Sequence, residues 1–298
     1  MLFPPRYSYP EAGSNVPLNL YISKPINAGK ALDAVSALEK QVQQWIQRSG
    51  KAVRLSDEAC ANLCFRIKDG SKIVISLRHP RLPESGVVDL YHTLDIGDSA
   101  TTHTVVLESA VRFAHSLGLN AAPREPQCAA EFFEVVEDDK GEDDLLQFPH
   151  IAVSPNLLSD GLVKVTASPY DKYGMVIKNM TDKAFYVSGV FYFDCSDLSI
   201  GYHQADKRMI PANGSMSFAN DTSYVPWTFY LREGQPRDIG FIKIFVTSAP
   251  IDLCGLAQER PFADVSRRVT TLDEEGIRNL LVDTITLVVD QYAPGVVV

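Results

Sequence analysis

The sequence predicts an α+β N-terminal domain followed by an all-β sandwich domain, and two observations carry this prediction. The first half of the chain holds two segments with the apolar spacing of an amphipathic helix. The second half is a series of short segments rich in aromatic and β-branched residues, with turn residues between them. A chain of 298 residues has room for both domains, since single cores usually stop growing at roughly 250 to 300 residues.

The N-terminal domain is expected at residues 16–136, after an irregular arm at 1–15 that holds three prolines. A strand at 16–23 precedes a helix at 30–48, whose apolar residues fall on one stripe. Further strands are expected at 51–55, 61–67, 72–77 and 87–94. A second helix is expected at 102–117. This order is typical of a mainly antiparallel sheet with helices on one face.

An acidic segment marks the boundary between the two domains. One more strand is expected at 131–136, and residues 137–144 then hold six acids and a single lysine. Such a run is typical of a solvated loop, so we place a linker at 137–149. The regular Asp, Asn and Gly spacing of a calcium-binding loop is absent from it.

The second domain, residues 150–298, is expected to be a sandwich of about eight short strands. The strands are expected at 150–154, 162–168, 173–179, 184–194, 216–218, 227–232, 239–248 and 281–290. A short helix is expected at 273–279. Residues 280–289 are apolar on both faces, which predicts a central strand.

Composition excludes several classes of protein. A net charge of -9 argues against nucleic-acid binding, which depends on clustered Lys and Arg. The N-terminus lacks the features of a signal peptide, and no run approaches the roughly 20 apolar residues that span a bilayer. Five cysteines without framework spacing indicate reduced thiols. We therefore expect a cytoplasmic protein without a membrane partner.

Several stretches of the C-terminal half resemble the C-terminal accessory module of caspase-like proteins from mushroom-forming fungi. The stretches are Tyr173–Asn179, Phe185–Asp194, Asp197–Ile200, Leu231–Gln235, Ile239–Thr247 and Ile251–Gln258, followed by Pro261 and Phe262. The resemblance covers residues 150–290, and 72–117 resembles more loosely the linker domain that precedes the module. It implies a β-sandwich of unassigned role that normally follows a cysteine-protease domain.

The protease domain itself is absent from this sequence. A caspase-like protease needs a Cys nucleophile and a His base, which in this family occur in His-Gly and Asp-x-Cys-His-Ser-Gly contexts. No histidine here is followed by glycine, and neither Cys128 nor Cys195 stands in a matching context. The resemblance therefore implies a stand-alone accessory part, acting with a protein partner of the caspase-like class.

A thiol, an acid and an imidazole lie close together in the sequence after the strand expected at 184–194. Cys195, Asp197 and His203 form the best candidate catalytic group, although a Cys after an aromatic strand is usually a small buried hydrophobe. Cys254 is a second candidate thiol. Cys60 and Cys64 lack a second ligand pair at metal spacing, so no metal or other cofactor is expected.

Aromatic residues also suggest a binding surface. Trp227, Tyr202 and His203 lie in a region dense in aromatic side chains, which could stack on sugar rings or hold a partner peptide, although strand alternation favours core packing. We predict a non-catalytic interaction or regulatory protein. The alternatives are a thiol-dependent hydrolase and a carbohydrate-binding protein.

Overall fold

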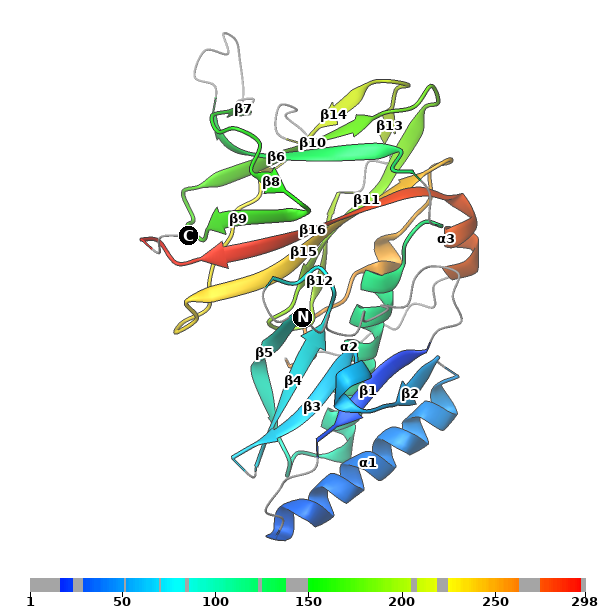
Figure 1. Ribbon diagram of the computed structural model, residues 1–298, viewed down its shortest axis with the longest axis vertical. Helices are drawn as coiled ribbons and strands as arrows, with labels where there is room; N and C mark the ends of the chain where they lie inside the picture. Colours follow the sequence, from blue (N-terminus) through cyan, green and yellow to red (C-terminus); the bar gives the residue numbers. More distant parts are fainter. Residues whose placement is uncertain are drawn as a thin grey trace, which may run out of the picture. The chain divides into compact units, whose positions relative to one another are not determined.

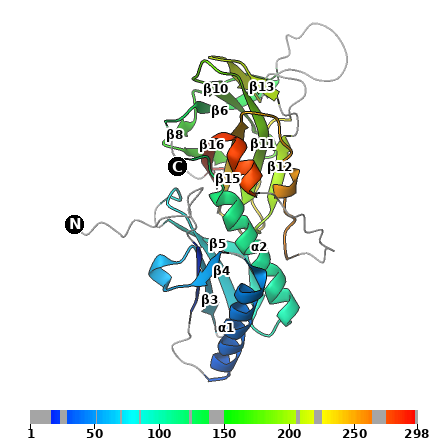
Figure 2. The same cartoon turned by 90° about the vertical axis from the view of Figure 1, so that its right-hand side faces the viewer.

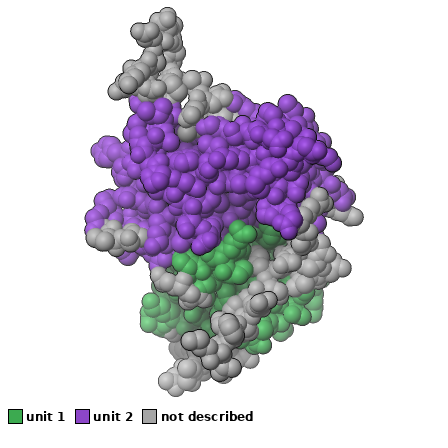
Figure 3. Space-filling model, turned by 45° about the horizontal axis from the view of Figure 1, so that its top comes forward, with its two compact units in different colours: residues 1–120, 193–201, 255–272 green, residues 121–192, 202–254, 273–298 purple. Residues whose placement is uncertain are grey.

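The computed structural model is rich in strands, which form three sheets, and has few helices in the part of the chain that it describes (Figure 1). The described residues are 17–23, 29–50, 52–69, 71–83, 86–122, 125–137, 150–204, 208–218, 225–262 and 274–295. The predicted arm at 1–15 and all of the predicted linker except Glu137 lie outside them. The chain divides into two compact units (Figure 3).

The first unit contains a five-stranded sheet of order β2-β1-β3-β4-β5. Its strands are β1 (Leu18–Ile22), β2 (Val53–Leu55), β3 (Leu63–Lys68), β4 (Lys72–Arg78) and β5 (Val87–Asp95). β1 pairs in parallel with both β2 and β3, whereas β4 is antiparallel to its neighbours. The predicted antiparallel character is wrong for β1, because a helix crosses over between β1 and β2 and returns the chain in the same direction.

Two helices cover one face of this sheet (Figure 2). α1 (Gly29–Ser49) buries Val35, Leu38 and Val42, which follow helical spacing. α2 (Ala100–Gly118) begins at Ser99, whose hydroxyl accepts a hydrogen bond of 3.1 Å from the Thr102 amide. A short 3-10 helix, η1 (Glu58–Cys60), precedes β3. None of the described helices has the length and apolar character needed to span a bilayer.

Two segments from the C-terminal half also belong to the first unit, namely 193–201 and 255–272. Ile200 and Gln258 exchange backbone hydrogen bonds of 2.8 and 3.0 Å, and the Tyr91 amide donates to the Ser196 carbonyl at 3.0 Å. The Gln258 side chain donates to the Ser109 carbonyl of α2 at 3.1 Å. The unit is therefore not one continuous stretch of sequence, unlike the predicted domain at 16–136.

The second unit holds a four-stranded sheet of order β14-β10-β6-β7. Its strands are β6 (Cys128–Glu137), β7 (His150–Ala152), β10 (Lys172–Asn179) and β14 (Ser215–Ser217). β6 pairs with β10 over the whole length of β10. The strand predicted at 131–136 therefore belongs to the second unit, which begins at Ala121 and not after the acidic segment.

A seven-stranded sheet makes up most of the rest of the second unit, with order β12-β11-β15-β16-β9-β8 and β13 paired to β11. Only the end of β11 and the start of β12 fall within 193–201 of the first unit. Its strands are β8 (Leu158–Ser159), β9 (Leu162–Thr166), β11 (Phe185–Asp194), β12 (Ile200–Gln204), β13 (Arg208–Ile210), β15 (Arg237–Thr247) and β16 (Leu281–Tyr292). The short helices are η2 (Cys254–Leu256) and α3 (Glu274–Leu280). β16 lies between β15 and β9, so the predicted segment at 280–289 is a central strand except for Leu280, which ends α3.

One hydrophobic core joins the four-stranded and seven-stranded sheets. Alternate residues of β15 point into it, namely Ile242, Ile244 and Val246, and all three are fully buried. Phe132 of β6 and Met175 of β10 enter the same core from the other sheet. The apolar residues of both sheets therefore stabilise a common interior.

Candidate functional site

Cys195, the candidate nucleophile, is fully buried at a turn that follows β11. Asp194 accepts a 2.8 Å hydrogen bond from the Ser196 amide, and Asp197 accepts one of 2.9 Å from the Ser199 amide. Both carboxylates thus bond to the backbone two residues onward, as Asp commonly does in turns. This bond gives Asp197 a structural role in the turn, and the burial of Cys195 leaves its thiol inaccessible to a substrate.

His203, the candidate base, lies in the second unit, whereas Cys195 and Asp197 belong to the first. Its ring stacks on Trp227 with the ring centroids 3.6 Å apart and the planes at 22°. Burial lowers the pKa of His203 to about 4, although a backbone hydrogen bond with Val225 acts in the opposite direction. The imidazole is therefore neutral at physiological pH.

The aromatic residues proposed as a binding surface point in different directions. Tyr202 stacks on Phe191, with ring centroids 4.8 Å apart, while its neighbour His203 stacks on Trp227. Strand alternation explains this, because successive side chains leave opposite faces of β12. Trp227 is only 5% exposed and packs in the core near Phe229. The three residues do not form one exposed surface.

Three of the other cysteines have raised pKa values, which is the opposite of an activated thiol. Cys60 is exposed, and a hydrogen bond with the Asp57 carboxylate raises its pKa. Burial raises the pKa of Cys64, and raises that of Cys128 to about 12. Cys254, the second candidate, is exposed at the start of η2. Within the described residues, no three His, Cys, Asp or Glu side chains gather closely enough to hold a metal ion.

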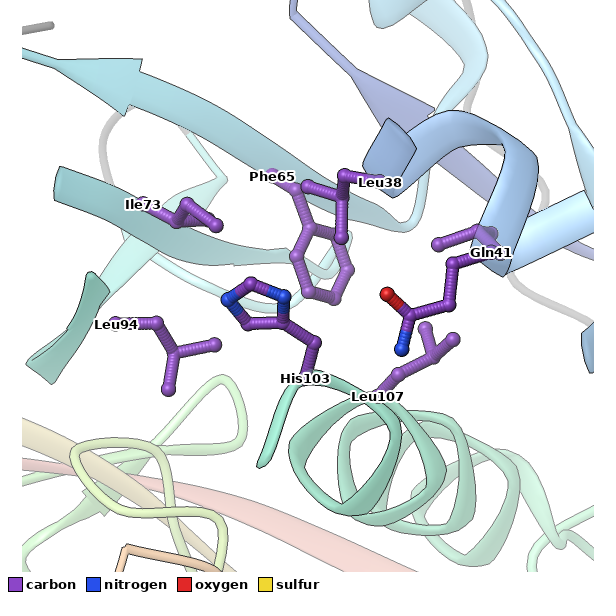
Figure 4. A pocket seen from close by; sticks show the side chains of 8 residues that line it. Leu38, Gln41, Phe65, Ile73, Leu94, His103 and Leu107 are labelled. Carbon is purple, nitrogen blue, oxygen red and sulfur yellow. The ribbon is translucent and has the colours of Figure 1, made fainter. Parts of the chain in front are cut away.

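A small cavity lies between the helices and the sheet of the first unit (Figure 4). Apolar side chains from both helices surround it, with His103 and Gln41 as the polar members. His103 Nε2 lies 2.9 Å from the Asp95 carbonyl, and Gln41 Nε2 donates to Thr104 Oγ1 at 2.8 Å. The space open to the centre of a water molecule is about 10 Å³, which holds one water at most. This cavity is too small for a substrate.

An exposed apolar strip lies at the β7 side of the four-stranded sheet, and the sequence reasoning missed it. Val136 and Ile151 stand directly opposite each other in the β6–β7 pair, and each is 43% exposed. Val153, two residues beyond Ile151, is 53% exposed. We call Val136, Ile151 and Val153 the aliphatic strip. In the sequence, the alternation of Ile151 and Val153 indicates two apolar side chains on one face of a strand. Only the strand register shows that Val136 lies beside them.

β7 is also the last strand of its sheet (Figure 1). The Val153 amide donates to the Glu134 carbonyl at 2.9 Å, so this residue faces β6 with its backbone. Because hydrogen bonding alternates along an antiparallel pair, the backbone groups of His150 and Ala152 point away from β6. The aliphatic strip thus lies beside backbone donors and acceptors of β7 that form no hydrogen bonds with any described strand.

Comparison with protein-family models, with curated proteins and with solved structures finds no match. Among the features described above, the aliphatic strip beside the β7 edge is the one that presents both apolar side chains and backbone hydrogen-bonding groups to a ligand.

Proposed function

We propose that this protein is a non-catalytic interaction or regulatory protein, related to the accessory region of fungal caspase-like proteins. We propose for it an α+β domain and a β-sandwich domain. The core shared by two sheets supports the sandwich, and three stretches that carry the resemblance contribute to this core through β10, β11 and β15. Its partner is a protein of the caspase-like class.

One observation carries the proposal: the candidate thiol of Cys195 is buried, while apolar side chains are exposed at a sheet edge. Cys195 is 0% exposed, whereas Ile151 and Val153 are 43% and 53% exposed. A nucleophilic thiol must be accessible and of lowered pKa, and exposed apolar groups beside an open strand favour association with another chain. No two of the five cysteines form a disulfide bond, which fits a cytoplasmic location.

The test combines binding and turnover, both with the full chain. We expect it to bind a purified caspase-like protein of a mushroom-forming fungus in isothermal calorimetry and to change that protein's rate on a fluorogenic peptide. The chain alone should hydrolyse neither peptide nor ester substrates. Absence of binding to the caspase-like protein would overturn the proposal.

A matched pair of variants tests the hydrolase alternative. Cys195→Ala and Cys254→Ala each remove one candidate thiol, one buried and one exposed. Brief alkylation of the native chain, read by mass spectrometry, should label Cys60 and Cys254 and leave Cys195 unmodified. Turnover by the wild-type chain that is lost in only one of the two variants would identify that thiol as a nucleophile and contradict a non-catalytic role.

A further inference from the structure

The turn between β11 and β12, residues 194–199, contains a strained leucine, and we call this turn the strap. Leu198 is fully buried and has a φ of 63°, in the left-handed region. Among the described residues, Asp69, Asp160 and Asn213 also have a positive φ, but their short polar side chains can hydrogen-bond to the local backbone. Leucine has no such group. Its conformation therefore persists only because the surrounding structure holds it.

Gln258 ties the strained residue to the first unit. Its Nε2 donates hydrogen bonds to the Leu198 carbonyl at 2.7 Å and to the Ser109 carbonyl of α2 at 3.1 Å. Its backbone amide and carbonyl bond to Ile200, directly after the strap, at 3.0 and 2.8 Å. One side chain thus connects the strap to a helix that lies about 90 positions earlier in the sequence. Loss of this side chain leaves the Leu198 carbonyl without its Gln258 donor.

The strap also covers the edge of the five-stranded sheet. β5 is the last strand of that sheet, and its Tyr91 amide donates to the Ser196 carbonyl of the strap at 3.0 Å. Within the strap, the Leu198 amide donates to the Asp194 carbonyl at 3.0 Å. A movement of the strap as a rigid body keeps this internal bond and breaks those from Tyr91 and Gln258. The strap can therefore leave β5 without losing its own turn.

We propose that the strap is a conformational switch that opens as a unit while the five-stranded sheet stays folded, and that Gln258 holds it closed. Opening uncovers the β5 edge and exposes Cys195, which is 0% exposed in the closed state. The burial of Cys195 and Leu198 favours the closed state, and the strain at Leu198 favours the open one. This switch does not depend on the proposed function.

Slow alkylation of the full chain with iodoacetamide tests this proposal, with the labelled cysteines identified by mass spectrometry. Cys64 of β3, 2% exposed in the same unit, reports unfolding of the sheet. Each rate is divided by the rate of the same thiol in the unfolded chain. We expect Cys195 to react at least about tenfold faster than Cys64, at a rate that stays constant in urea below the unfolding transition. Equal rates with the same urea dependence would overturn the proposal, because the strap would then open only with global unfolding.

A matched pair of glutamine variants tests the role of Gln258. Gln258→Ala should label Cys195 at least about tenfold faster than wild type, because a carbonyl of the closed state loses its donor, and should leave the Cys64 rate unchanged. Gln41→Ala removes another side chain bonded to α2, through Thr104 Oγ1 at 2.8 Å, and should change the Cys195 rate by no more than about twofold. If Gln258→Ala labels Cys195 like wild type, Gln258 does not hold the strap.

Two substitutions of Leu198 isolate the backbone strain, and they do so with Gln258 in place. Leu198→Ala and Leu198→Gly both remove the buried side chain, but glycine alone adopts a positive φ without steric cost. We expect the glycine variant to label Cys195 about fivefold more slowly than the alanine variant. Equal labelling of the two variants would show that strain at this position does not drive the opening and would contradict the switch.

Discussion

The four-stranded sheet of the second unit ends in two different ways. On the β14 side, Trp227 and Tyr173 exchange backbone hydrogen bonds of 2.8 and 2.9 Å, and the indole ring is buried in the core. On the opposite side, β7 leaves its outward backbone groups unpaired by any described strand, and Ile151 is 43% exposed. Trp227 thus covers the side of β10 that continues beyond β14, which we call the covered edge. The outer side of β7 pairs with no described strand, and we call it the open edge.

This difference teaches that residue type alone does not mark a binding surface. Aromatic residues are the most conspicuous signal in the sequence near Trp227, and there they pack with each other, with Tyr192, Phe229 and His203 around the indole. The aliphatic strip is less conspicuous and remains accessible. Aromatic side chains gain most from burial, so a dense aromatic region more often forms a core than a surface.

Removal of β6, which lies between β10 and β7, should have the largest effect on the stability of the second unit. Fragment 150–298, the predicted sandwich, lacks β6, whose Phe132 is fully buried and whose backbone pairs with all of β10. We expect this fragment to show no cooperative thermal transition in near-ultraviolet circular dichroism. Fragment 121–298 retains β6 and should show one. A cooperative transition in fragment 150–298 would mean that β6 is dispensable for the core.

Truncation of Trp227 at the covered edge should have the next largest effect on the free energy of unfolding. Trp227→Ala leaves a cavity in the core and should reduce the free energy of unfolding by about 3 to 5 kcal/mol, measured by urea denaturation. Tyr230→Ala is the matched control, because Tyr230 is 69% exposed, and its loss should stay within about 0.5 kcal/mol. Similar losses in both variants would contradict the burial of Trp227.

Local patterns in the sequence predicted most of the elements but not their grouping. The helix at 30–48 and the strands at 173–179 and 239–248 correspond to α1, β10 and β15, because their apolar spacing reflects the face that each buries. The assignment of segments to units depends on long-range pairing. The pairing of β6 with β10 and the contacts of 193–201 in the first unit leave no local signal.

The candidate site was harder to predict for the same reason. Proximity in sequence grouped Cys195 with His203, yet the two residues belong to different units. Alternation along β12 sends Tyr202 and His203 to different aromatic partners. The aliphatic strip requires the register of Val136 against Ile151 across a gap in the described chain, which no short sequence pattern contains.

His203 should make the covered edge sensitive to acid. Its folded-state pKa of about 4 lies below the usual value of 6.5, so protonation favours the unfolded chain. The neutral His203 side chain contributes fully to stability above pH 6.5. As the pH falls toward 4 this contribution is lost, and the free energy of unfolding decreases by up to about 3 kcal/mol. His203→Phe keeps a ring against Trp227 without titrating. Urea denaturation across this range should give a shallower loss for the variant, and parallel pH profiles would exclude His203 as the cause.

Substitution at the open edge should have the smallest effect on stability. Ile151→Ala removes a side chain that is 43% exposed, so the free energy of unfolding should change by no more than about 0.5 kcal/mol in urea denaturation. The same variant should still weaken binding of the proposed caspase-like partner in isothermal calorimetry, because an exposed aliphatic contact is lost. A residue that matters to binding and not to folding is what a partner surface requires. If Ile151→Ala instead destabilised the protein as much as Trp227→Ala, the strip would be part of the core, and the contrast between the two edges would disappear.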